Sequence, residues 1–307
     1  MARRLTRAIL QVSAVIIVIA LSGATVQANA ERASHAAFPA PGQLVDVGSG
    51  QLIHLRTWGA ATGGPTILLD VSAGQPSSIW AWIASDLGRH YRVVAYDRPG
   101  MAWSIGPSGP RDAESAAEAL SSALAAAGIE PPFVVVGHSF GGLSARVFAG
   151  QRRADMAGLV LLDTTHPNGG GGAGFALFAR HRAWQGHSGL FQLFPPSNDY
   201  TQLPAAEQPG AYAVSLWTTH MDATADELES WNTSAAQVRS AGDLGDLALL
   251  VVSSPGSSAS VDLQRDLARL SSKSRFVELN VSHMGMLMDT DQAAVTAAEI
   301  ERFLDSL

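Results

Sequence analysis

A serine between two glycines, directly after a run of apolar residues, is the strongest chemical signal in the chain. Residues 133–136 are all apolar, and Gly-His-Ser-Phe-Gly follows them at 137–141. In this spacing the serine lies on a sharp turn between a strand and a helix, which holds its hydroxyl at the edge of a sheet. Gly137 and Gly141 are needed because a side chain at either position would strike the neighbouring strand or helix. We therefore predict Ser139 as a nucleophile, with an ordinary structural turn as the alternative.

The rest of the chain supplies alternating elements that could position this turn. Short apolar or β-branched runs predict strands at residues 52–57, 66–71, 92–96, 133–136, 158–162, 248–252 and 275–279. Helix-like segments lie between them at 80–87, 112–127, 140–150, 261–270 and 291–304. Several strand segments are continuously apolar, which is typical of parallel strands covered by helices on both faces. The predicted fold class is α/β, with a doubly wound, mostly parallel sheet.

The alternation breaks once, between the strands that end at Leu162 and begin at Ala248. The intervening stretch is rich in aromatic residues, and a compact domain rarely contains a structureless loop of that size. We therefore predict a mainly helical lid insertion at residues 164–246. The core is then divided into a first part at 43–163 and a second part at 247–307.

The chain resembles the α/β-hydrolase superfamily from Gly42 to Leu307. Four motifs look like those of exported or membrane-anchored bacterial serine hydrolases of the esterase type: Pro-Gly-Gln-Leu-Val-Asp-Val-Gly at 41–48, Tyr-Asp-Arg-Pro-Gly at 96–100, Pro-Pro-Phe at 131–133 and Val-Leu-Leu-Asp-Thr-Thr-His-Pro at 160–167. The resemblance implies the chain order nucleophile, acid, histidine. It does not identify a substrate.

The resemblance places the catalytic histidine after the last strand. His283 lies there, between the segments 275–279 and 291–304. We predict His283 as the general base that takes the proton of Ser139. His138 is the middle residue of the serine turn and is expected to point away from the hydroxyl, and His166 lies too early in the chain.

The acid of the triad has two candidates. Relatives usually carry a Gly-x-x-Asp turn after the penultimate strand, but residues 253–260 contain no carboxylate and the first one is Asp262. Asp262 could instead stabilise the N-terminus of a helix. Asp163 ends the strand 158–162, where some lipases of the fold place the acid, although it could equally fix a loop. We rank Asp163 ahead of Asp262, and expect either one to accept the Nδ1–H of His283 and stabilise the imidazolium.

The resemblance also implies an oxyanion hole made of two backbone N–H groups. One belongs to Phe140, the residue after the nucleophile, and the other to the loop after the strand 66–71. Counting back from Trp80 assigns the second donor to Ala73, with Ser72 as its neighbour. Arg98, in the Asp-Arg-Pro-Gly segment at 97–100, is expected to fix a loop by a salt bridge.

The N-terminus has the pattern of a targeting segment. Arg3, Arg4 and Arg7 precede an apolar run at 8–21, and Ala-Asn-Ala at 28–30 matches a cleavage site. We predict a secretory signal peptide at 1–30, followed by an irregular spacer at 31–42. The alternative is an uncleaved anchor, because residues 8–26 could just span a bilayer. Either way the folded part is expected outside the cytoplasm, secreted or in the periplasm or cell envelope.

Composition excludes several other classes of protein. The chain of 307 residues has 27 acidic and 20 basic side chains and a formal charge of −7, so a nucleic-acid partner is not expected. It has no cysteine, which excludes disulfides, a thiol nucleophile and cysteine-ligated zinc. It shows neither a glycine-rich phosphate loop nor clustered metal ligands, so we expect no metal and no organic cofactor.

The pattern as a whole predicts a carboxylesterase that acts on small or hydrophobic acyl esters through an acyl-enzyme on Ser139. The alternatives are a non-catalytic ligand-binding module of the same fold and a cofactor-free haloperoxidase, which keeps the same triad. Haloalkane dehalogenation and epoxide hydrolysis use an aspartate at the position of Ser139 and are disfavoured. The expected partner is a small ester, and a membrane is expected to be a partner only if the N-terminal segment is retained.

Overall fold

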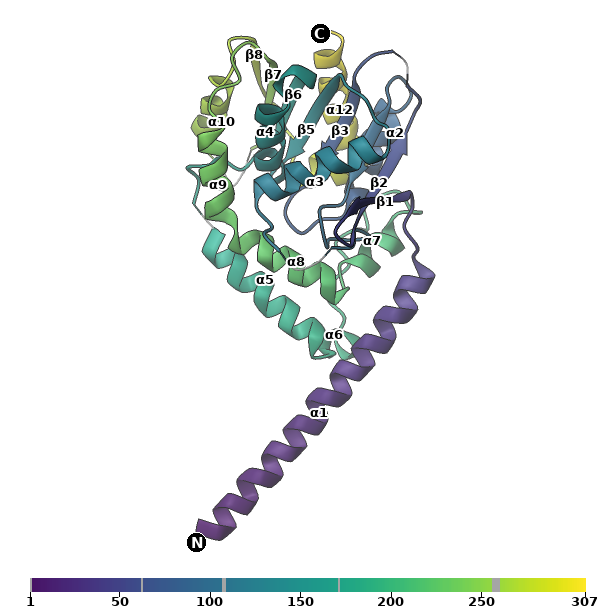
Figure 1. Ribbon diagram of the computed structural model, residues 1–307, viewed down its shortest axis with the longest axis vertical. Coiled ribbons are helices and arrows are strands. Elements are labelled where there is room, and N and C mark those ends of the chain that lie inside the picture. Colours follow the sequence, from purple (N-terminus) through teal and green to yellow (C-terminus); the bar gives the residue numbers. More distant parts are fainter. Residues whose placement is uncertain (1, 62, 107–108, 171, 256–259) are drawn as a thin grey trace.

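The computed structural model describes residues 2–61, 63–106, 109–170, 172–255 and 260–307. A twisted eight-stranded sheet is covered by helices on both faces, and a long N-terminal helix projects away from it (Figure 1). The strands lie in the order β1-β2-β4-β3-β5-β6-β7-β8. The strands β3 to β8 pair in parallel, whereas β1 and β2 are antiparallel to their neighbours. The predicted α/β class with a mostly parallel sheet is therefore confirmed.

All seven predicted strands are present, and an eighth was missed. The strands are β1 (Gln43–Gly48), β2 (Gln51–Trp58), β3 (Thr66–Asp70), β4 (Val93–Tyr96), β5 (Phe133–His138), β6 (Met156–Leu162), β7 (Ala248–Ser253) and β8 (Ser274–Glu278). The missed strand, β1, lies at the edge of the sheet and has no buried residue. It lacks the continuous apolar pattern that marks the central strands.

The continuous apolar runs arise because each central strand packs against a core on both faces. In β5, Phe133 and Val135 belong to one apolar cluster, and Val134 and Val136 belong to the other. The first cluster is completed by α3 (Ala113–Ala126), α4 (Gly141–Gln151), α9 (Trp231–Ser240) and α10 (Val261–Ala268). The second is completed by η1 (Ser77–Trp80), α2 (Ala81–Leu87), α11 (Gly285–Met288) and α12 (Thr290–Leu304).

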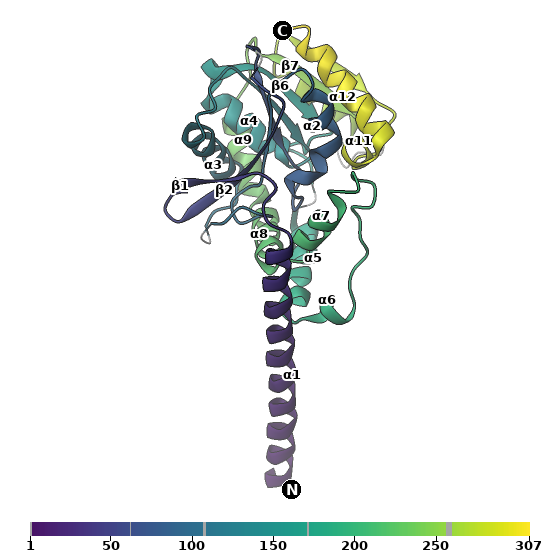
Figure 2. The ribbon, with the colours of Figure 1, turned by 90° about the vertical axis from the view of Figure 1, so that its right-hand side faces the viewer.

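Helices also fill the long interval between β6 and β7. They are α5 (Gly172–His187), α6 (Leu190–Leu193), α7 (Gln208–Val214) and α8 (Thr218–Glu229), followed by α9. The helices α5 and α8 lie side by side below the sheet, on the side from which the N-terminal helix extends (Figures 1 and 2). These helices lie within the predicted insertion at 164–246, and we call α5 to α8 the lid.

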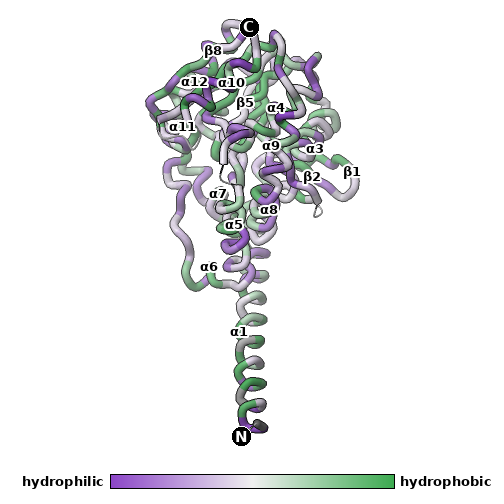
Figure 3. Tube along the Cα trace, turned by 90° about the vertical axis from the view of Figure 1, so that its left-hand side faces the viewer, coloured by the Kyte–Doolittle hydropathy of each residue, from purple (hydrophilic) through white to green (hydrophobic). Residues whose placement is uncertain are grey.

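The N-terminal helix, α1 (Ala2–Ala37), passes without a break through the predicted cleavage site. Within the described chain it is the one helix that is long and apolar enough to cross a membrane, by length and composition (Figure 3). Its apolar part fits either a signal peptide or an anchor. The expectation of an irregular spacer is wrong for residues 31–37, which are helical. Five of these seven residues are Glu, Arg or Ala, which favour a helix, and the side chains of Glu31 and Ser34 are also hydrogen-bonded to the lid.

The packing around the serine turn generates a stability prediction. A Cβ atom on Gly137 would lie 2.7 Å from the Cα atom of Gly142 and 2.8 Å from the carbonyl oxygen of Gly141. Backbone atoms cannot move aside cheaply, so Gly137→Ala is expected to lower the free energy of unfolding by about 1–3 kcal/mol. Urea unfolding followed by circular dichroism measures this.

Gly174→Ala is the matched control for the glycine substitution. Gly174 lies in α5, and a Cβ atom there would meet no atom within 4 Å. This variant should be stabilised by up to about 1 kcal/mol, because alanine favours a helix over glycine. Equal stability of the two variants would contradict the packing argument.

Candidate active site

Ser139 occupies the sharp turn between β5 and α4 that its motif predicts. Its φ angle is +53°, in the left-handed region that residues other than glycine rarely adopt. The turn is held from β6, because the Ser139 N–H donates to the Leu162 carbonyl (3.1 Å) and its carbonyl accepts from the Thr165 N–H (3.0 Å). The serine is only partly buried. A strained and accessible serine of this kind is what a nucleophile elbow requires.

His283 lies in the loop between β8 and α11, and the structure brings it to Asp163. The Nδ1 atom of His283 is 2.6 Å from Oδ2 of Asp163 at the end of β6. The carboxylate is fully buried, whereas the imidazole is 28% exposed. A carboxylate only accepts, so the Nδ1 of His283 carries the hydrogen in this pair and Nε2 is the nitrogen left to exchange a proton.

Asp163 is held in this position by the adjacent strand. Its φ angle is +44°, its N–H donates to the Val252 carbonyl (2.7 Å), and its carboxylate accepts from the Ser254 hydroxyl (2.6 Å). The rival candidate, Asp262, is an exposed residue in the first turn of α10, a helix capped by Ser260. The intervening residues 256–259 lie outside the described residues. The structure thus places Asp163 against His283 and places Asp262 at a helix N-terminus.

His138, the middle residue of the serine turn, contacts His283. Its Nε2 lies 3.0 Å from the backbone carbonyl of His283, and the two ring centroids are 4.6 Å apart. Because a carbonyl only accepts, His138 must carry its proton on Nε2, and its Nδ1 therefore accepts from the Ser72 hydroxyl (2.9 Å). Burial lowers the pKa of His138 to about 3, so the ring stays neutral. The residue supports the loop that carries His283.

The two N–H groups predicted for the oxyanion hole belong to segments in contact. A Cβ atom on Gly141 would lie 2.4 Å from the carbonyl oxygen of Val71, so the loop after β3 abuts the start of α4. Within the described chain, neither the Phe140 N–H nor the Ala73 N–H has a hydrogen-bond acceptor. Phe140 lies at the N-terminus of α4, where free donors favour an anion, and such a site suits a developing oxyanion.

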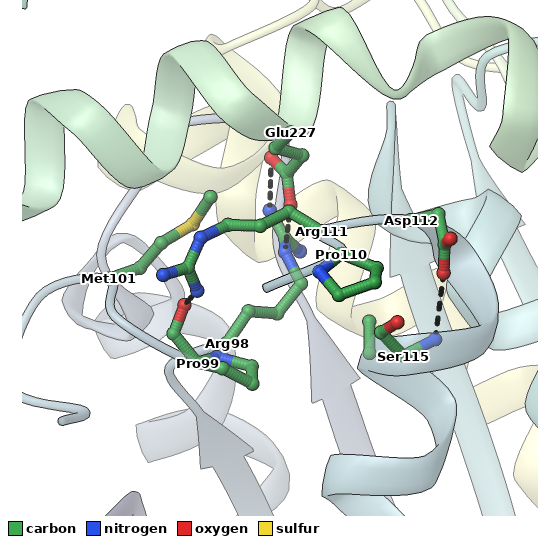
Figure 4. A pocket seen from close by; sticks show the side chains of 9 residues that line it. Arg98, Pro99, Met101, Pro110, Arg111, Asp112, Ser115 and Glu227 are labelled. Carbon is green, nitrogen blue, oxygen red and sulfur yellow. Dashed lines mark hydrogen bonds and ion pairs between the residues drawn. The ribbon is translucent and has the colours of Figure 1, made fainter. Parts of the chain in front are cut away.

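Arg98 is hydrogen-bonded to the loop after β3. Its guanidinium donates to Oδ1 of Asp70 (2.6 Å) and to the carbonyls of Val71 (2.6 Å) and Ser72 (2.9 Å). The same guanidinium donates to the carboxylate of Glu227 on α8 (2.5 and 3.1 Å), beside a small cavity (Figure 4). Burial favours loss of the Arg98 charge, but the Glu227 and Asp70 carboxylates outweigh it and raise the pKa of Arg98. The predicted loop-fixing salt bridge is therefore present, and it reaches the lid.

A second connection from the lid is His220 on α8. Its Nε2 donates to the Gly74 carbonyl (3.1 Å), and its Nδ1 accepts from the Ala102 N–H (3.0 Å). Burial lowers the pKa of His220 to about 4; Asp97 opposes this shift, whereas Arg182 and Arg98 add to it. The neutral ring of His220 thus holds Gly74, the residue that follows Ala73.

A cavity of about 290 Å³ lies between the lid and the loop after β3. We call residues 71–75 the oxyanion loop, after the donor predicted at Ala73. Phe175 and Phe178 of α5 contribute an apolar wall, Ala73 and Gly74 contribute the oxyanion loop, and Arg182 contributes a positive charge. Its size suits a small ligand with an apolar group.

Together the fold and the site define a class of hydrolase. A sequence model of the alpha/beta hydrolase family matches residues 52–299, and the chain belongs to that family.

Solved structures agree with this assignment. The enol-lactonase from Burkholderia xenovorans LB400 superposes with a TM-score of 0.66 at 24% identity, over 85% of this chain and 99% of that one. A membrane phospholipase A, described as a bacterial virulence factor, superposes with a TM-score of 0.63 at 21% identity, over 100% of this chain and 99% of that one. At these identities the likeness shows the fold alone.

Relatives by sequence match over shorter stretches. The uncharacterized protein YqjL of Bacillus subtilis (strain 168) is 31% identical over 102 residues, which is 33% of this chain and 40% of that protein. This chain spans less than half the length of the curated relatives that it matches.

Sequence reasoning missed the residues that hold the candidate site together. It assigned no role to His138, to Ser72 as its partner, to Ser254 or to Glu227. The signal for His138 was its place inside the serine motif, next to Ser139. Glu227 had no local signal, because its partner Arg98 is 129 positions away.

The buried lid histidine generates a prediction for stability against pH. An unfolded histidine takes up a proton below pH 6.5, whereas folded His220 does so only near pH 4, so its contribution is complete above pH 6.5 and is lost as pH falls toward 4. In His220→Gln the difference in unfolding free energy between pH 7 and pH 5 should shrink by about 2 kcal/mol. Urea unfolding at the two pH values measures it.

The exposed His90 provides the control for this experiment. His90→Gln removes one imidazole from the surface and so controls for the loss of a histidine as such. His138 is unchanged in both variants and cancels from the comparison. An identical pH dependence in the His220 and His90 variants would refute the role assigned to His220.

Proposed function

We propose that the protein is a serine carboxylesterase that cleaves esters with a hydrophobic acyl group. The observation that carries the proposal is the 2.6 Å contact between His283 Nδ1 and the buried Asp163 carboxylate. Asp163 follows β6, the strand that pairs with β5, and β5 leads directly into Ser139 with its φ angle of +53°. Asp163 would hold the tautomer in which His283 Nε2 is free to accept the proton of Ser139.

The first half of the reaction acylates the enzyme. Ser139 Oγ attacks the carbonyl carbon of the ester while His283 Nε2 takes the hydroxyl proton, and the carbonyl oxygen becomes an oxyanion. The N–H groups of Phe140 and Ala73 stabilise that oxyanion. The tetrahedral intermediate then expels the alcohol, which receives the proton from His283.

The second half releases the acid. A water molecule gives a proton to His283 Nε2 and attacks the acyl carbon, and a second tetrahedral intermediate forms on the same oxyanion hole. Its collapse breaks the bond to Ser139 Oγ, and the proton returns from His283 to the serine. No step needs a co-reactant other than water.

Two features support an ester with an apolar group as the substrate. The cavity beside Ala73 has Phe175 and Phe178 in its wall. Proteins that share the fold include ones described as an enol-lactonase, a thermophilic esterase and a membrane phospholipase A, whose names all refer to cleavage of an ester or a lactone.

Labelling with a fluorophosphonate probe tests the nucleophile. The full-length protein should be labelled and should hydrolyse p-nitrophenyl esters, whereas Ser139→Ala should lose the label and roughly 10⁴-fold or more in kcat/KM. His283→Ala should slow both reactions by a similar order. A folded protein that stays unlabelled would instead favour the ligand-binding module.

A matched pair of substitutions tests the acid. Asp163→Asn should lower kcat roughly 10³- to 10⁴-fold, because an amide at this position stabilises the wrong tautomer of His283. Asp262→Asn removes the other carboxylate and should change kcat by less than about twofold, since its side chain is exposed on α10. The reverse ranking would assign the acid to Asp262.

A further inference from the structure

The last third of α1 is hydrogen-bonded to the lid. Gln27 is 3% exposed, although it lies only three positions before the predicted cleavage point. Its amide nitrogen donates to the Leu216 carbonyl (3.3 Å), and its amide oxygen accepts from Gln192 (3.0 Å). A buried amide with both ends hydrogen-bonded to the lid marks a specific contact.

Beyond that point α1 supplies the cap of a lid helix. The N-terminus of α8 has no side-chain cap of its own at Trp217. The carboxylate of Glu31 accepts from the Thr218 N–H (3.0 Å) and from the Thr218 hydroxyl (2.9 Å) instead. Ser34, one turn further on, accepts from the indole N–H of Trp217 (2.9 Å). A carboxylate at a helix N-terminus stabilises it through hydrogen bonding and the helix dipole.

Before Gln27, the backbone of α1 touches the turn between α5 and α6 directly. A Cβ atom on Gly23 would lie 2.1 Å from the Ser188 carbonyl, and one on Gly189 would lie 2.3 Å from the Gly23 carbonyl. The contacts at Gly23 and Gln27 lie before Ala30, and those at Glu31 and Ser34 lie after it. Cleavage after Ala30 would therefore cut a helix that the lid holds on both sides of the cut.

The part of α1 before these contacts is exposed and apolar. The described side chains of residues 9–22 are all exposed, and Leu10, Ile19 and Leu21 are each at least 64% exposed. Residues 8–26 would extend about 29 Å as a helix, close to the hydrocarbon thickness of a bilayer. Arg3, Arg4 and Arg7 precede them, which favours a cytoplasmic N-terminus.

The lid carries exposed apolar side chains of its own. Six apolar residues in α5, in α6 and directly after α6 have side chains that are between 55% and 74% exposed. We call them the lid patch: Phe175, Leu177, Phe178, Trp184, Leu193 and Phe194. Leu177, His181 and Trp184 form an outward stripe on α5, where a surface helix normally carries charged residues. The opposite face of α5 is already buried through Ala176, Ala179 and Ala183.

The lid patch begins where the exposed apolar part of α1 ends. Leu193 and Phe194 directly follow Gln192, which bonds to Gln27. In Figure 3 the apolar stretch of α1 extends away from the protein below the level of α6. A bilayer crossed by α1 therefore has its surface at the α5–α6 end of the lid.

We propose that α1 is retained as a membrane anchor and that the lid patch rests in the interface of the same bilayer. The lipid surface is the occupant of the patch, and α1 sets its orientation through Gly23, Gln27 and Glu31. The cavity wall formed by Phe175 and Phe178 then lies beside the lipid. The proposal concerns binding and does not depend on the esterase activity.

The first experiment follows the fate of the N-terminus. The full chain with a C-terminal tag is expressed in a bacterial host, and membranes are extracted with alkaline carbonate. The protein should remain in the pellet, and its intact mass should include residues 1–30. A mature chain that begins at Glu31 would overturn the proposal.

The second experiment measures contact with lipid at single positions. Because the chain has no cysteine, Leu177→Cys, Trp184→Cys and Phe194→Cys can each carry one environment-sensitive fluorophore, with the exposed Ser306→Cys near the C-terminus as control. In proteoliposomes of phosphatidylethanolamine and phosphatidylglycerol, headgroup spin-labelled lipid should quench the lid probes at least twofold more than the Ser306 probe. Equal quenching at all four positions would overturn the proposal.

A variant of α1 separates anchoring from orientation. Gly23→Leu should keep the chain in the membrane but lower quenching of the lid probes toward the Ser306 level, because the side chain collides with Ser188. The adjacent and exposed Ala24→Leu should change nothing. Unquenched lid probes that cross-link between two chains would show a second copy as the occupant and would refute the lipid assignment.

Discussion

The buried guanidinium of Arg98 donates five hydrogen bonds, and these connect the sheet, the oxyanion loop and the lid. The proposed chemistry depends on the relative positions of these three parts. Arg98 follows β4, bonds to Asp70 and two carbonyls of the oxyanion loop, and pairs with Glu227 on the lid. Asp70 in turn accepts from the hydroxyls of Tyr96 and Ser144, the latter on the helix that follows the nucleophile. Removing one partner of such a group would leave an uncompensated buried charge. The oxyanion loop is therefore positioned by the sheet, by α4 and by the lid at the same time.

Backbone strain is concentrated at the same edge of the sheet. Ser139 and Asp163 end the adjacent strands β5 and β6, and both have φ angles in the left-handed region although neither is glycine. Each costs about 1–3 kcal/mol, and such conformations persist only where the surroundings determine them. Here the surroundings are backbone hydrogen bonds from the next strand or its extension, since Ser139 bonds to Leu162 and Asp163 bonds to Val252. The strained turns place the side chains of Ser139 and Asp163 at the edge of the sheet where His283 lies.

The lid has two surfaces with different partners. Its inner surface bonds to the core through His220 and Glu227, which hold the oxyanion loop. Its outer surface carries the exposed aromatic and aliphatic side chains and the docking site of α1. A helix that enters a bilayer and also caps α8 would link the position of the lid to the membrane. The same contacts stabilise the helix at residues 31–37, whose Glu, Arg and Ala residues already favour that conformation.

The amino-acid sequence by itself determined the α/β class, seven of the eight strands and the sharp turn at Ser139, because these depend on local patterns of apolar residues and glycine. It also indicated His283 by its place after the last strand. It ranked Asp163 ahead of Asp262 but left both open, since the distance from either one to His283 is set by strand order and loop path. Only the tertiary structure placed the Asp163 carboxylate 2.6 Å from His283 Nδ1 and packed the ring of His138 against that of His283. It also paired Arg98 with Glu227. Contacts between residues more than a hundred positions apart leave no periodicity in the chain, and they form only when the sheet, the lid and α1 pack together.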